Sequence, residues 1–177
     1  ANRVNEILGR QKGTYRPVHP NDHVNLGQSS NDVFPTAIHI ASVNLLQHRL
    51  IPVLRNLHQA LKSKEKKFHP ILKVGRTHLQ DALPIRLGQE FGGYARQMNL
   101  SLHRIQKALE SLHELPLGGT AVGTGMNTHP LFAKKVISIM NEMTRGRFHE
   151  AADHFEAQGA KDALVEMSGA LKTVAVS

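Results

Sequence analysis

The longest regular pattern in the chain is a set of apolar residues that recur every three or four positions between residues 87 and 112. Its members are Leu87, Phe91, Tyr94, Met98, Leu102, Ile105, Leu109 and Leu112. A repeat of about 3.5 residues puts all of them on one face of a single helix. It also suits near-parallel packing against other helices. We therefore expect a long core helix in this part of the chain.

Shorter helical patterns flank the long one. They cover residues 1–8, a helix that begins at Asn31 or Asp32, its kinked or restarted continuation around Pro52 up to His69, residues 132–143, and a last helix from near Ala160. The first and last patterns run to the chain ends without a capping residue, so both ends should lie inside helices. Turn-forming residues occupy 17–22 and 118–125, and only residues 71–74 favour an extended segment. The predicted fold class is all-α, a bundle of long helices.

The same spacing predicts which side chains of the shorter helices are buried. The expected buried positions are Leu54, Leu57 and Leu61, then Phe132, Val136, Ile139 and Met143, and finally Ala163, Leu164, Met167, Leu171 and Val174. Each set recurs every three or four residues, as one face of a helix requires.

Composition favours a folded, soluble protein. Hydrophobic residues make up 40% and charged residues 20% of the chain, and no stretch approaches the roughly 20 apolar residues that would span a membrane. The net charge of +8 could attract nucleic acid or small anions, but aromatic residues are only 5%. The one dense lysine run, at residues 62–67, is typical of a solvated helix end. Neither nucleic acid nor membrane is expected as a partner.

Several kinds of catalytic or metal site are excluded by spacing. The chain has 12 histidines and no cysteine, but His149 and His154 are five residues apart, whereas the zinc helix motif needs four. No metal is therefore expected. The glycines of residues 118–125 lack the Lys and Ser or Thr of a P-loop, and no G-x-S-x-G motif of a serine hydrolase occurs.

Two polar clusters remain as candidate sites. Residues 28–32 (QSSND) open a predicted helix, where hydroxyls, an amide and free backbone N–H groups could bind a carboxylate. An ordinary capping sequence explains them equally well. Residues 75–78 (GRTH) are expected in a loop, where a histidine can exchange protons near neutral pH or serve only as polar surface.

Seven segments, taken in order, resemble one family over nearly the whole chain. They are residues 19–22 (HPND), 28–32 (QSSND), 75–81 (GRTHLQD), 87–90 (LGQE), 118–125 (GGTAVGTG), 127–130 (NTHP) and 155–157 (FEA). The chain resembles the class II fumarases of the fumarase and aspartase superfamily. The resemblance implies reversible hydration of fumarate to malate without a metal or organic cofactor.

The resemblance also implies roles for individual residues. It implies that Ser29, Ser30, Asn31 and Thr77 bind the substrate carboxylate. It implies that His78 handles a proton or the reacting water. A second dicarboxylate site is implied at His19, Pro20, Asn21 and Asp22.

An incomplete enzyme is expected from the same resemblance. Residues 1–30 would close an N-terminal domain, and residues 31–177 would form part of a central helical bundle. The family's serine-rich catalytic loop has no match here, so these residues alone should be inactive. The resemblance implies a homotetramer whose active sites combine residues of three subunits, with the face from Leu87 to Leu112 between subunits. The expected location is the cytoplasm, or the mitochondrial matrix in a eukaryote.

Two alternatives stay open. Aspartate ammonia-lyase belongs to the same superfamily, but it typically has Thr in place of Ser30, Gln in place of His78 and no histidine at His129. All three residues favour fumarase. The other alternative is a non-catalytic helical module that assembles through the face of the long helix.

Overall fold

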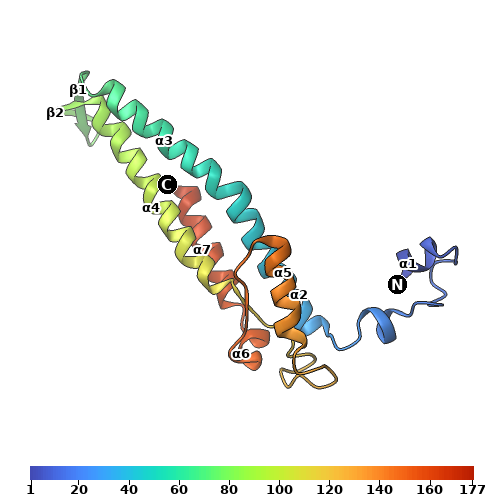
Figure 1. The fold of residues 1–177 in the computed structure, drawn as a ribbon. Coiled ribbons are helices and arrows are strands. Elements are labelled where there is room, and N and C mark those ends of the chain that lie inside the picture. Colours follow the sequence, from blue (N-terminus) through green and yellow to red (C-terminus); the bar gives the residue numbers. More distant parts are fainter. The chain divides into compact units, whose positions relative to one another are not determined.

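The computed structural model describes all residues from Ala1 to Ser177, and helices dominate it (Figure 1). The predicted all-α class is confirmed, with four short strands added. The chain forms two compact units: the first is Ala1–Ile40 with His113–Lys161, and the second is Ala41–Leu112 with Asp162–Ser177. The domain boundary expected after residue 30 stays a prediction. None of the helices combines the length and the apolar character needed to cross a membrane.

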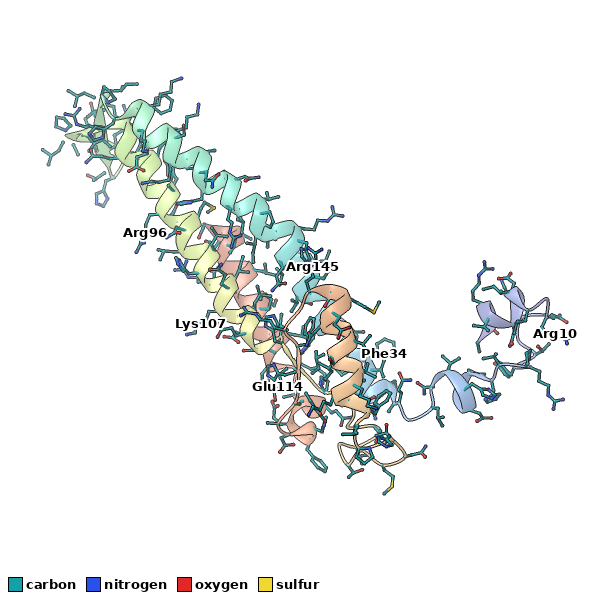
Figure 2. The ribbon with its side chains drawn as sticks, viewed as in Figure 1. Arg10, Phe34, Arg96, Lys107, Glu114 and Arg145 are labelled. Carbon is teal, nitrogen blue, oxygen red and sulfur yellow. The ribbon has the colours of Figure 1, made fainter.

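The second unit is built on two long helices that lie side by side, α3 (Ile51–Phe68) and α4 (Leu87–Ser111) (Figure 1). The predicted long helix is thereby confirmed. Its start is fixed because the Arg86 N–H donates to the Gln89 side chain at 2.8 Å. Helix α7 (Asp162–Val176) packs along α4, where the Ser111 hydroxyl donates to Glu166 at 2.9 Å. The charged side chains of Arg96 and Lys107 project outward from α4 (Figure 2).

The core of this unit follows the predicted face of α4 only in part. Leu102 is 7% exposed and Ile105 is fully buried within the single chain, whereas Tyr94 remains 48% exposed. Because α3 and α7 both pack on α4, the C-terminal half of the face is already covered inside one chain. The expectation that the whole face lies between subunits is therefore wrong for this half. On α7 the prediction is confirmed most clearly at Met167, which is 3% exposed.

The predicted interruption at Pro52 is confirmed as a restart. Helix α2 (Ser30–Leu45) passes into a single π-helical turn, η2 (Leu46–Leu50), and α3 begins one residue before Pro52. Proline has no backbone N–H to donate to the preceding turn, so a wider turn at this point accommodates it. On α3 the burial of Leu54 is confirmed, but Leu57 is 45% exposed.

The first unit consists of short elements, and its small core lies between residues 115 and 151. It contains α1 (Asn2–Ile7), the π-helical turn η1 (Pro20–Val24), the start of α2, β3 (Glu114–Leu115), α5 (Phe132–Thr144), β4 (His149–Glu150) and α6 (His154–Gly159). Strands β3 and β4 pair in parallel, and neither was predicted, because two residues are too few to show a period. The core residues are Leu115, Leu117, Ala133, Ile137, Phe148 and Ala151.

The predicted buried face of α5 is partly wrong. Ala133 and Ile137 are buried, whereas Ile139 is 54% and Met143 is 80% exposed. The prediction favoured the larger apolar residues. The small Ala133 faces inward instead, because the glycine-rich loop passes directly over it: a Cβ atom on Gly118 would lie 2.7 Å from the Cβ of Ala133.

Candidate functional site

The start of α2 carries the first polar cluster, and its cap differs from the prediction. The Ser29 hydroxyl accepts from the Asn31 N–H at 3.2 Å, and the Ser29 N–H donates to the Asp32 carboxylate at 2.9 Å. The Ser29 side chain therefore caps an N–H of the first turn, while Asp32, the third helical residue, satisfies the N–H of the cap. The helix therefore begins at Ser30, and Ser29 is the cap in place of Asn31 or Asp32. As a result Ser30 and Asn31 lie in the first turn with exposed side chains, at the positive end of the helix dipole.

Asp32 ties this cluster to the glycine-rich loop. Its carboxylate is fully buried and accepts the N–H groups of Gly118 at 3.1 Å and Thr120 at 3.0 Å, as well as that of Ser29. The Asn31 side-chain amide adds a further bond, to the Ala121 carbonyl at 2.8 Å. The first turn of α2, with Ser30 and Asn31, and the loop of residues 118–125 are therefore bonded to each other.

Two features hold the loop against Asp32: the conformation of its glycines and a hydrogen bond from α6. Gly118 has φ of 104°, a left-handed conformation that side chains disfavour, and this conformation leaves its N–H directed at Asp32. On the other side, the Gln158 side chain donates to the Thr120 carbonyl at 2.7 Å. The loop is thus bonded both to α2 and to α6.

A hollow of about 490 Å³ opens beside the start of α2. Ser30, Asn31 and Lys161 line its polar part, and Phe34, Val122 and Phe155 are among its apolar walls. Figure 2 shows Phe34 on α2. The Lys161 ammonium group donates to the carbonyls of Gln158 at 2.6 Å and Ala160 at 2.9 Å, which leaves one of its three N–H bonds for a ligand. A hydroxyl, an amide and a cation around one hollow suit a carboxylate.

The second polar cluster lies on a β-hairpin, where a loop was predicted. Strands β1 (Leu72–Thr77) and β2 (Gln80–Arg86) pair antiparallel, and Thr77 pairs with Gln80. The extended segment predicted at residues 71–74 is confirmed but is longer than expected. The connection is His78 and Leu79 alone, with φ of 50° and 61°. Two left-handed residues define the type I′ turn that joins strands most tightly.

His78 therefore occupies the tip of the hairpin with an exposed side chain, and Thr77 is exposed beside it. A left-handed conformation costs a non-glycine residue roughly 1–2 kcal/mol, so both turn residues are held there by the paired strands. Arg76 and Asp81 form an ion pair at 3.1 Å across the base of the turn. A bulge in β2 opposite Gly75 shifts the strand register, and a side chain on Gly75 would meet the Leu83 carbonyl at 2.8 Å.

The turn η1 replaces the loop predicted at residues 19–22, with His19 as its cap and Pro20, Asn21 and Asp22 inside it. The His19 ring nitrogen Nδ1 accepts the N–H groups of Asn21 at 3.3 Å and Asp22 at 3.2 Å, and Pro20 takes the first position of the turn. The four residues of the implied second dicarboxylate site are thus local neighbours on the surface.

The predicted residues fall into three groups. Ser29 to Asn31 and residues 19–22 belong to the first unit, and Thr77 and His78 belong to the second. Sequence reasoning took Asp32 only as a candidate helix cap within the polar cluster of residues 28–32, and it assigned no role to Lys161. The burial of Asp32 could have been suspected from its place in the cap, but its partners Gly118 and Thr120 lie 86 and 88 residues away in the chain. No local signal pointed to Lys161.

A family model confirms the resemblance read from the motifs. The model of Lyase_1, described as "Lyase", matches residues 1–177. The chain belongs to this lyase family. Within it, the chain is similar to proteins named fumarate hydratase. It is 57% identical to a class II fumarate hydratase of Nitrosomonas europaea, over 99% of this chain and 38% of that protein. It is 54% identical to a mitochondrial fumarate hydratase of Danio rerio, over 100% of this chain and 35% of that protein.

Solved structures agree with this assignment. A fumarate lyase:delta crystallin from Brucella melitensis superposes with a TM-score of 0.91 at 39% identity, over 99% of this chain and 38% of that chain. A class II fumarase from Schistosoma mansoni superposes with a TM-score of 0.88 at 36% identity, over 99% of this chain and 40% of that chain. The chain therefore spans well under half the length of the relatives it matches.

Proposed function

We propose that the intact protein that contains this chain catalyses the reversible hydration of fumarate to (S)-malate. The observation that carries the proposal is the arrangement at the start of α2. The exposed Ser30 and Asn31 lie there at the positive end of the helix, and they line the same hollow as Lys161. The relatives named fumarate hydratase, at 50–57% identity over the whole chain, supply the substrate. Fumarate and malate are C4 dicarboxylates, which such a site suits.

The proposed chemistry divides the work between two kinds of group. Elimination of water from malate needs a base for the C3 proton, an acid for the departing hydroxyl, and donors for the charge that develops on the adjacent carboxylate. Ser29, Ser30, Asn31 and Thr77 are the proposed donors. His78 is the proposed group that moves a proton or orients the water, and an exposed imidazole at a hairpin tip is free to meet a ligand. The proposal requires no metal or organic cofactor.

The proposed assembly is a homotetramer with active sites shared between subunits. An exposed hairpin tip supports it, because Leu79 is 93% exposed next to His78 and would be covered if the tip entered a site of another copy. Phe34, beside the carboxylate cluster, is 68% exposed in the single chain. Residues 19–22 remain the proposed second dicarboxylate site. The cytoplasm, or the mitochondrial matrix in a eukaryote, is the proposed location.

Removing a carboxylate ligand should raise KM. Asn31→Ala and Thr77→Ala each delete a hydrogen bond to a carboxylate that is present in the ground state and the transition state alike. Loss of one charge-assisted bond costs about 1.5 to 3 kcal/mol, which corresponds to an increase in KM of about 10- to 150-fold with little change in kcat. Steady-state kinetics of the intact protein with malate would measure this. His19→Asn is the control, and a KM that is unchanged in both alanine variants would remove these residues from the site.

Lys161 should contribute mainly through its positive charge. Replacing it with glutamine removes a cation from the hollow, and a pair of charges at 4 Å is worth about 1 kcal/mol in a solvated setting. The KM for malate should rise about fivefold in Lys161→Gln, and high salt should reduce the difference. Lys135→Gln, on the exposed side of α5, is the matched control. Equal KM values for the two variants would show that Lys161 does not face the substrate.

The function itself is tested by identifying the product. The intact protein, incubated with fumarate and followed by proton NMR, should produce malate until equilibrium is reached. Release of ammonia from aspartate without any malate from fumarate would replace the proposal by an aspartate ammonia-lyase. Inactivity toward both substrates would favour a non-catalytic helical module.

A further inference from the structure

We infer that Asp32 is a positioning residue, whose buried carboxylate holds the substrate-binding residues of α2 and the glycine-rich loop in one fixed arrangement. The inference rests on the proposed function for the identity of the ligand. The bridge itself rests only on the geometry of the first unit.

The two oxygens of Asp32 serve different segments. Oδ1 accepts the Ser29 N–H at 2.9 Å, and Oδ2 accepts the N–H groups of Gly118 at 3.1 Å and Thr120 at 3.0 Å. The carboxylate is fully buried, and no cation is among these partners. A buried charge is costly unless hydrogen bonds compensate it, so the three donors keep the carboxylate in place and it in turn fixes them.

Helix capping does not account for this arrangement. The bond from Ser29 completes the cap, and it needs only Oδ1. The two bonds to Oδ2 come from residues 86 and 88 positions away and do nothing for the helix. Their effect is to fix the loop beside the first turn of α2.

The loop in turn orients Asn31, one of the residues proposed to bind the substrate carboxylate. Thr120 is held by Asp32, and the next residue, Ala121, accepts the Asn31 amide at 2.8 Å. This bond uses one of the two N–H groups of the Asn31 amide and holds the other in a defined direction for a carboxylate. Asp32 therefore acts on the site by two routes, through Ser29 directly and through the loop onto Asn31. Asp32 itself does not contact the substrate in this arrangement, because its carboxylate is fully buried.

The test uses Asp32→Asn in the intact protein. Asparagine has nearly the same shape but offers an NH₂ group in place of one oxygen, so it cannot accept from both segments. Amide hydrogen exchange should become faster in residues 29–33 and in residues 117–121 together. The KM for malate should rise tenfold or more, while kcat changes less than threefold, because the affected bonds hold the carboxylate in both states.

The matched control is Asn141→Asp, also in the first unit. The Asn141 amide accepts from the Phe148 N–H at 2.7 Å and donates to the Phe148 carbonyl at 2.8 Å, so its side-chain hydrogen bonds go to Phe148 and not to α2 or the glycine-rich loop. Its replacement should speed exchange around residue 148 and leave KM within twofold of the unmodified protein. Should Asp32→Asn fail to fold, Asp32→Ser removes the charge with a smaller, hydrated side chain and is measured in the same way.

The outcomes separate the two claims. Faster exchange in only one of the two segments, or a KM no higher than that of Asn141→Asp, would overturn the role of Asp32 while the proposed function stands. If the unmodified protein does not hydrate fumarate, the proposed function fails. The hydrogen-exchange data then test the role of Asp32 on their own. Faster exchange in both residues 29–33 and residues 117–121 supports that role, and faster exchange in only one of these segments refutes it.

Discussion

Replacing His78 with asparagine in the intact protein is expected to lower kcat for malate dehydration by about 10²- to 10⁴-fold, with only a small change in KM. A group that moves a proton or orients the reacting water acts mainly in the transition state, and this range is what general acid–base catalysis typically contributes. Asparagine keeps a polar side chain of similar reach and adopts the left-handed conformation readily, so the φ of 50° at the hairpin tip should be retained. Steady-state kinetics in both directions would measure the effect.

His19→Asn is the matched control for this prediction. It changes the other histidine with an implied role, the half-buried His19 that caps the turn η1. Its kcat should stay close to that of the unmodified protein, because the implied second dicarboxylate site takes no part in the reaction. If His78→Asn retained kcat within a few-fold and His19→Asn abolished it, the two sites would have to be exchanged.

Replacing Leu102 with aspartate should unfold the second unit. Truncating a buried leucine costs about 2–5 kcal/mol, and an uncompensated buried charge adds several more. This sum approaches or exceeds the whole stability of a typical domain, about 5–15 kcal/mol. Urea denaturation followed by circular dichroism should show either a much lower midpoint or no folded baseline.

Val165→Asp provides the comparison on the same unit. Val165 is 69% exposed in the first turn of α7, where an acidic side chain favours the helix dipole. Its midpoint should lie close to that of the unmodified chain. If Leu102→Asp kept the stability of Val165→Asp and only changed the oligomeric mass, the long-helix face would be an interface between subunits after all.

The predictions that succeeded were those carried by long, regular patterns. Eight apolar residues at helical spacing fixed α4 with little ambiguity, because such a run fits no strand. Short patterns were less informative. On α5, periodicity could not show that the small Ala133 faces the core, since that depends on a loop 15 residues earlier in the chain at Gly118.

The hairpin shows a different limit. Strand β2 contains Pro84 and is exposed along most of its length, so it lacks the alternation by which a strand is recognised. Its partner β1 was seen only up to residue 74, and His78 was consequently placed in a loop instead of a tight turn. His78 was still identified as a candidate, because the prediction rested on the residue type and the surrounding motif and not on the secondary structure.

The candidate site was predictable where its residues are neighbours in sequence. Ser29, Ser30 and Asn31 form one polar run at a helix start, and this local cluster was visible. Asp32 and Lys161 depend on contacts between segments about 90 and 130 residues apart, which no spacing rule reports. The resemblance to fumarases supplied roles for Ser29, Ser30 and Asn31. It supplied none for Asp32 and Lys161.

The most direct test of the proposed fumarate hydratase activity compares two substrates on the intact protein, with His78→Asn measured in parallel. We expect fumarate to be hydrated to malate rapidly, aspartate to release ammonia at a negligible rate, and the variant to lose most of the hydration rate. Deamination of aspartate faster than dehydration of malate by the unmodified protein would contradict the account and identify an aspartate ammonia-lyase instead.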